Sequence, residues 1–259
     1  MGKQLQILRI LQLWTHREIV SRYAGSVGGL LWALLQPLLT IALYYFVFAV
    51  VLKVRIPELA SEEGYFLYLL AGLLPWLGLA EGLAAAAASL VANESLLKKV
   101  VFPVGILPLS SVLAALVPQV VALAVFLVVL AAVGPLSVQG LLWLPVVLGC
   151  QLAMTVGLGM MLAVLTFYFR DLQQLIPVVM QFLFYMAPVL YPRDFVPPQY
   201  QGWLVVHPFA TLIDGYHRAL LDLPWSEDSR LALMLWTLFL GGGGLIGYRR
   251  LRRSMGAWL

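Results

Sequence analysis

The chain has 259 residues, of which 62% are hydrophobic and only 11% carry a charge. A soluble globular domain carries about 25% charged residues, so this composition excludes a soluble enzyme. Intrinsic disorder is excluded as well, because disorder requires low hydrophobicity and high net charge. A membrane-spanning helix needs about 20 apolar residues, so the length allows about six spans with short connections. No room is left for a separate soluble catalytic domain of ordinary size.

The N-terminal residues 4–23 are expected to form a helix that lies along the membrane surface. Ile7, Ile10, Leu11 and Trp14 share one face of that helix, and polar side chains occupy the other. No uninterrupted apolar segment precedes a small-residue cleavage site, so a cleaved signal peptide is not predicted. A simple cytoplasmic tail is the alternative interpretation.

Long apolar stretches with few charges follow this segment, and they are expected to cross the membrane. They cover residues 30–52, 64–93, 100–169, 172–192 and 231–248. The stretch 100–169 is too long for one helix at about 1.5 Å per residue, and Gly134-Pro135 and Gln139-Gly140 mark a turn within it. We therefore expect a helical hairpin at 107–133 and 141–168. The fold class predicted for the single domain 1–259 is an all-α integral membrane protein with six transmembrane helices.

The basic residues indicate how the spans are oriented. With six spans both termini lie on one side, and that side holds eleven of the sixteen Lys and Arg residues. Cytoplasmic loops carry the excess of Lys and Arg, so both termini are predicted to be cytoplasmic. The net charge of +4 reflects this asymmetry and does not indicate a nucleic-acid partner.

The sequence lacks the motifs of several chemistries. It has no phosphate-binding loop for ATP, no zinc-ligand spacing, and no serine nucleophile motif with a histidine in a later span. His16, His207 and His217 lie outside the predicted spans and are interpreted as polar loop residues near the headgroups. Glu81 is the one ionisable residue inside a predicted span. This argues against proton-coupled transport. An ion-coupled secondary transporter is nevertheless the main alternative function, and an intramembrane enzyme is the next alternative.

The segment 93–103 is predicted to be a short, separately capped helix on the cytoplasmic side. Asn93 is a suitable N-cap, Glu94 suits the positive start of a helix, and Lys98 and Lys99 suit its negative end. Its apolar residues, Leu96 and Leu97 among them, are expected to be exposed. The helix either docks a cytoplasmic partner or rests on the lipid surface.

The external segment 195–221 is apolar, although it is too interrupted to span the membrane. Pro208 separates two short pieces at about 199–206 and 209–221. This pattern is typical of a re-entrant helix pair that dips into the bilayer from outside. A small external cap is the alternative.

Four motifs together carry a family resemblance. They are R-Y-x-x-S-x-x-G-x-x-W-x-x-x-x-P at 22–37, N-E-S-L-L-K-K-V-x-F-P at 93–103, A-P-V-L-Y-P at 187–192, and the segment 207–218 that begins H-P-F-A-T-L-I. In order and spacing they resemble the permease subunits of ABC exporters for polysaccharides and polyol phosphates. Many members of that family have Asn where His207 stands, and often Arg directly after the tyrosine, where this chain places His217 before Arg218.

The resemblance implies an assembly in the bacterial cytoplasmic (inner) membrane. A second copy of the chain and two ABC ATPase subunits are the implied protein partners, and the ATPases hold ATP and Mg²⁺, so this chain needs no cofactor. The implied cargo is a lipid-linked glycan, O-antigen-type first and capsule or teichoic acid next. The implied ATPase-docking residues belong to the 93–103 segment: Asn93, Glu94, Leu96, Leu97, Lys98, Lys99, Val101 and Phe102. The implied channel and gate residues are Glu81, Tyr44, Tyr185, Tyr191, Trp203, Phe209 and Arg218.

Overall fold

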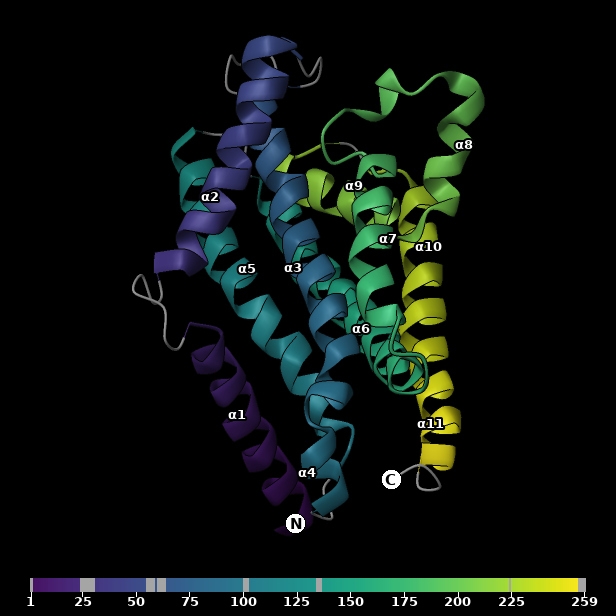
Figure 1. Cartoon of the computed structure of the whole chain (residues 1–259). Helices are drawn as coiled ribbons and strands as arrows, with labels where there is room; N and C mark the ends of the chain where they lie inside the picture. Colours follow the sequence, from purple (N-terminus) through teal and green to yellow (C-terminus); the bar gives the residue numbers. More distant parts are fainter. Residues whose placement is uncertain are drawn as a thin grey trace.

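The computed structural model describes residues 2–23, 31–54, 59, 64–99, 103–133, 137–223 and 225–255. Within these ranges all regular structure is helical (Figure 1). The helices are α1 (Gly2–Tyr23), α2 (Leu31–Tyr45) with its π-helical continuation η1 (Phe46–Val51), α3 (Gly64–Ala92), α4 (Glu94–Lys99), α5 (Ile106–Val133), α6 (Val138–Tyr168), α7 (Leu172–Met186), the 3₁₀ turn η2 (Arg193–Phe195), α8 (Pro198–Val206), α9 (Pro208–Leu221), α10 (Glu227–Trp236), the π-helical η3 (Thr237–Gly242) and α11 (Gly243–Met255).

Four helical stretches of the described residues are long and apolar enough to cross a membrane. They are Gly64–Ala92, Ile106–Ala132, Val138–Tyr168 and Glu227–Ser254. Two shorter apolar helices, Leu38–Val51 and Leu172–Met186, match the remaining predicted spans. The expectations of an all-α membrane protein and of a helical hairpin in 100–169 are confirmed, although residues 134–136 of its turn lie outside the described ranges. The count of six spans remains a prediction.

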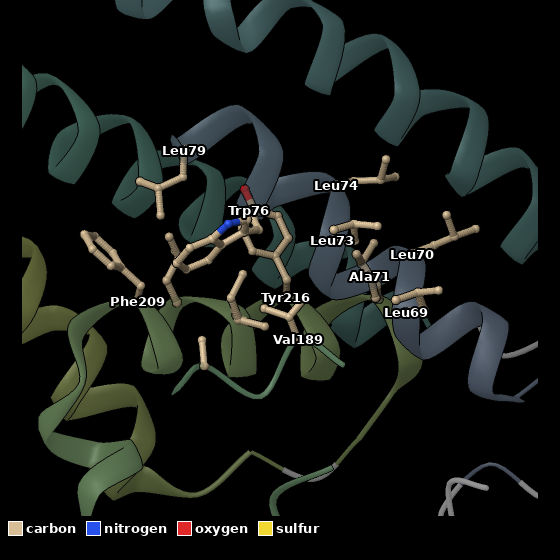
Figure 2. Packing of buried hydrophobic residues seen from close by; sticks show 14 of the residues in the cluster. Leu69, Leu70, Ala71, Leu73, Leu74, Trp76, Leu79, Val189, Phe209 and Tyr216 are labelled. Atoms are coloured by element: carbon tan, nitrogen blue, oxygen red, sulfur yellow. The ribbon is translucent and has the colours of Figure 1, made fainter. Parts of the chain in front are cut away.

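Helix α3 lies at the centre of the bundle and packs against α5, α6, α7 and α9. Most of its leucines are buried, with Leu69 and Leu79 at 0% exposure. Figure 2 shows residues of α3 facing Phe209 and Tyr216 of α9, with Val189 beside them. The main core therefore lies between a predicted span and the segment 195–221, so α9 is an integral part of the bundle.

The N-terminal helix α1 forms over the predicted range and packs along α5 (Figure 1). Trp14 contacts a second apolar cluster that includes Leu90, Leu97 and Tyr248. Other apolar side chains of α1, such as Leu13 at 71% exposure, point away from the bundle. The helix is confirmed, whereas its place on the membrane surface remains a prediction.

Helix α6 and the C-terminal stretch approach each other through glycines. A Cβ atom built on Gly157 would lie 2.2 Å from the carbonyl oxygen of Gly241, and one on Gly244 would lie 2.3 Å from backbone atoms of Gly157. Small residues at such a contact allow two membrane helices to pack backbone against backbone. This contact sets the position of α11 against α6.

Candidate functional site

A groove of about 280 Å³ lies between α2, α3 and α7. Tyr44, Trp76 and Phe184 line it from one helix each, and Thr40 and Gln181 add polar groups. The ring centroids of Tyr44 and Phe184 lie 5.4 Å apart, and those of Trp76 and Phe184 lie 5.5 Å apart. An aromatic lining with a few polar groups is the usual character of a binding cleft, and it suits a ligand with both apolar faces and hydroxyl groups.

Of the three tyrosines predicted as channel residues, Tyr44 lines this groove, whereas Tyr185 and Tyr191 are not among its lining residues. The ring of Phe184 lies between the two tyrosines Tyr44 and Tyr185 in a series of contacts, with 5.4 Å to the ring centroid of Tyr44 and 5.2 Å to that of Tyr185. Tyr191 donates its hydroxyl hydrogen to the carbonyl oxygen of Tyr185 at 2.8 Å. The sequence analysis missed Trp76 and Phe184. They are aromatic residues inside predicted spans, but the sequence did not show which face of α3 or α7 they occupy.

Glu81 has a charged partner in the structure, since it forms an ion pair with Arg22 at the end of α1. The Glu81 side chain is half exposed, whereas that of Arg22 is only 17% exposed. Glu81 therefore pairs α3 with α1. Glu81 is not among the residues that line the groove.

The segment 195–221 forms two helices, as predicted. α8 ends at Val206 and α9 begins at Pro208, because proline is favoured in the first turn of a helix, where its missing N–H needs no partner. Arg218 and Asp214 form an ion pair at 2.8 Å, with side chains 18% and 22% exposed. Trp203 is 54% exposed on α8.

Phe209 differs from the expectation of an accessible gate residue. It is 4% exposed, and its ring lies edge-on to Trp76 at 6.1 Å between centroids. Phe209 is therefore a core residue that joins α9 to α3.

The interpretation of His207 and His217 as loop residues near the headgroups is wrong. His207 is 3% exposed and caps α9, because its Nδ1 accepts a hydrogen bond from the backbone N–H of Ala210 at 2.9 Å. Asparagine is a preferred N-cap residue and fills the same role, which accounts for the Asn that many members of the resembled family carry here. His217 is 2% exposed and stacks on Tyr68 with 3.8 Å between ring centroids, and its Nε2 lies 3.0 Å from the Tyr68 carbonyl oxygen.

A buried network of polar side chains joins four helices. Gln151 of α6 bonds Gln119 of α5, and its Nε2 also donates to the carbonyl oxygen of Pro75 in α3 at 3.0 Å. Tyr216 of α9 donates its hydroxyl hydrogen to Gln151 Oε1. Sequence reasoning passed over both glutamines, although a polar residue within an apolar span is itself a signal, because it requires a partner.

The short helix α4 lies at the end of the bundle opposite α8 and α9 (Figure 1). Asn93 does not cap it with its side chain as expected. Instead, the Asn93 Nδ2 donates to the carbonyl oxygen of Ser89 at 2.8 Å, in the last turn of α3. Glu94 pairs with Lys98 at 2.7 Å and with Arg170 at 2.9 Å. Lys98, and secondarily Arg170, lowers the pKa of the Glu94 carboxyl below its usual value, so the charged form persists to lower pH.

The expectation that the apolar residues of α4 are all exposed is wrong for Leu97. This side chain is 9% exposed and lies in the cluster with Leu90, Leu107 and Tyr248, and Leu96 packs against the same cluster. The exposed residues of α4 are Ser95, Lys98 and Lys99. Val101 and Phe102 lie outside the described residues.

Comparison with known proteins places the chain among transporters. The family model for the ABC-2 type transporter matches residues 9–221. An O-antigen export system permease protein of Klebsiella pneumoniae is 31% identical over 214 residues, which cover 82% of this chain and 80% of that protein. A permease of the same name from Myxococcus xanthus is 33% identical over 202 residues, covering 77% of this chain and 75% of that protein. A polysialic acid transport protein of Escherichia coli is 23% identical over 230 residues, covering 87% and 88%.

Proposed function

The chain belongs to the ABC-2 type transporter family, and from this premise we propose that it is the permease through which an ATP-driven exporter moves lipid-linked polysaccharide out of the cell. The similarity to O-antigen export permeases makes an O-antigen-type glycan the first choice, with capsule or teichoic acid next. A permease of this family carries no ATPase of its own, so ATP and Mg²⁺ bind to a separate subunit.

The observation that carries this proposal is the aromatic groove between α2, α3 and α7. Apolar side chains beside it are exposed, among them Leu43 of α2 and Val178 and Phe182 of α7. In our proposal a second copy of the chain covers this face, so that the two grooves enclose one channel. Tyr44 and Tyr185 then offer ring faces to the sugars that pass.

We also propose a role for α4 on the cytoplasmic side of the membrane. We assign it to docking of the ATPase, with the exposed Ser95, Lys98 and Lys99 as the contact surface and two ATPase subunits per pair of permeases. Arg170 joins α4 to the turn before α7 through Glu94. A displacement of α4 on ATP binding is thereby passed to a helix that lines the groove.

On the external side, we propose that α8 and α9 dip into the outer half of the bilayer and gate the channel exit. Burial of α9 against α3 and α6 supports this, because backbone at membrane depth must be covered by protein or by a water-filled cavity. The exposed apolar side chains of α8, such as Trp203 and Val206, then face lipid or the second copy.

Export of surface glycan in the native host tests the function. The chromosomal gene is deleted and variants are supplied in its place, and glycan is measured on the surface and inside the cell. We expect Tyr44→Ala and Tyr185→Ala to lower surface glycan and to accumulate lipid-linked glycan inside. The matched control is Phe239→Ala, since Phe239 is 67% exposed and lies on the C-terminal stretch away from the groove.

The partner ATPase distinguishes the proposal from an ion-coupled transporter. Substitution of its phosphate-binding lysine should abolish export, because hydrolysis supplies the energy. Export that continues with this ATPase variant and stops when the proton gradient is collapsed would support the ion-coupled alternative instead.

A further inference from the structure

A second cavity, of about 130 Å³, lies beside the proposed gate, at the end of the bundle where α8 and α9 are found (Figure 1). Its wall combines α8, α9, α10, Tyr68 of α3 and residues of the stretch 188–194. The charged residues of the wall are Arg193, Asp194, Asp214 and Arg218. Pro188 and Leu204 are among its apolar residues, so the cavity offers both a dry surface and hydrogen-bonding groups.

The charges of this wall cancel. Two guanidinium groups and two carboxylates line it, so the cavity has no excess positive charge with which to favour a phosphate or a carboxylate. The same set places strong donors beside strong acceptors. A neutral ligand that carries several hydroxyl groups matches this arrangement, because each hydroxyl both donates and accepts.

Much of the hydrogen-bonding capacity of the wall is unused. Arg218 donates through its Nε to Asp214 Oδ2 at 2.8 Å. The two terminal nitrogens of Arg218 and the Oδ1 of Asp214 have no hydrogen-bond partner among the residues that the structure describes. Within the same ranges the side chains of Arg193 and Asp194 have none either. Adjacent hydroxyls of a sugar ring fit such a pair, one donating to the carboxylate and the next accepting from the guanidinium.

The α9 part of the wall is also held in place, since two residues between Asp214 and Arg218 are tied to neighbouring helices. His217, next to Arg218, stacks on Tyr68 and bonds its carbonyl oxygen. Tyr216 is tied to Gln151 in α6. A cavity whose polar groups are positioned beforehand loses less entropy when it binds.

We propose that this cavity binds one neutral sugar residue of the glycan as it leaves the channel. The inference rests on the proposed export function, which supplies the sugar at this end of the bundle. The volume is far above the roughly 10–15 Å³ that one water needs on the same measure, so a sugar ring has room.

Binding of free sugar to the purified complex tests the site. The chain and its ATPase are placed in lipid nanodiscs and titrated with neutral oligosaccharides prepared from the surface polysaccharide of the native host, and saturation-transfer NMR reports binding. We expect Arg193→Gln and Asp194→Asn each to weaken binding roughly three- to tenfold, as loss of one or two hydrogen bonds requires. Both side chains lack partners among the described residues, so we expect unchanged thermal unfolding, which is measured alongside.

A control variant and several contrary outcomes distinguish failure of the proposed sugar site from failure of the proposed export function. Arg230→Gln removes an arginine on α10 that is not part of the wall, and it should leave binding unchanged. Equal binding by all variants, or tighter binding of a hexuronate or of inorganic phosphate than of the neutral sugar, overturns the site. Export of glycan without saturable sugar binding overturns the site but leaves the function standing. Sugar binding by a chain that exports no glycan overturns the proposed function instead.

Discussion

Gln119 of α5 and Gln151 of α6 exchange two side-chain hydrogen bonds, of 2.7 and 2.8 Å, inside an otherwise apolar bundle. A buried polar group with no partner is costly, and each amide satisfies the other. Because Gln151 also bonds Pro75 and Tyr216, the pair ties α9 to three neighbouring helices. The proposed gate helix is therefore held by specific polar contacts as well as by apolar packing.

Replacement of Gln151 should destabilise the protein more than replacement of either partner alone. Gln151→Leu leaves the amide of Gln119 and the hydroxyl of Tyr216 buried without this partner. We expect the free energy of unfolding to fall by about 1 kcal/mol. A side-chain hydrogen bond between membrane helices contributes about 0.6 kcal/mol on average, and a buried polar group left without a partner costs about 1–3 kcal/mol. Thermal unfolding in detergent measures the change.

The double variant is the control for this prediction. Gln119→Leu combined with Gln151→Leu removes both amides, so it should recover part of the stability that Gln151→Leu loses. A double variant as unstable as the sum of the single variants would show that the pair is not coupled.

The cap of α9 predicts a difference between two substitutions of His207. His207→Ala removes the acceptor for the Ala210 N–H and should cost about 1 kcal/mol of unfolding free energy. His207→Asn keeps an acceptor of suitable reach and should stay within about 0.5 kcal/mol of the parent. Limited proteolysis across 198–221, together with thermal unfolding, checks both. Equal loss in the two variants would contradict the cap.

Substitutions at two residues of α4 should affect different properties, because one side chain is buried and the other is exposed. Leu97→Ala opens the cluster around Leu90 and should lower stability by about 2 kcal/mol. Lys99→Glu should leave unfolding unchanged while lowering the amount of ATPase that copurifies with the permease. Copurification of the ATPase at the parent level with Lys99→Glu would contradict the proposed docking surface.

The glycine contact between α6 and the C-terminal stretch predicts that alanine destabilises the protein at one glycine of α6 and does not destabilise it at another. Gly157→Ala places a methyl group against the backbone of Gly241 and should destabilise by about 1–3 kcal/mol. Gly149, in the same helix, has no atom within 4 Å of the added carbon. Gly149→Ala should therefore be neutral or stabilise by up to about 1 kcal/mol. The comparison uses thermal unfolding of both variants.

The charge asymmetry predicts which residues are reachable from outside the cell. In a Cys150→Ser background, a cysteine at Glu227, whose side chain is 89% exposed, should react with an impermeant thiol reagent. A cysteine at Lys98, whose side chain is 48% exposed, should react only after the membrane is opened. Reaction at position 98 in intact cells would overturn the orientation.

The sequence alone determined the elements that depend on apolar length and on breakers. The long uncharged runs predicted the spans, and the Gly and Pro residues near 134–140 predicted the turn between α5 and α6. Pro208 predicted the division between α8 and α9, because proline lacks the N–H that an interior helical residue donates and is favoured in the first turn of a helix. These features follow from local composition, so one chain was enough to find them.

Only the tertiary structure decided which side chains meet. Leu97 and Phe209 were expected at exposed positions and lie in the core, because neighbouring helices cover the faces that they occupy. The burial of His207 and His217 depends on where α9 packs, and Glu81 acquires a partner only because α1 ends beside α3. The groove forms where α7 lies beside α2 and α3, which are far from it along the chain. A span that is apolar on every side does not reveal which face turns inward, and that choice is made by the packing of the bundle.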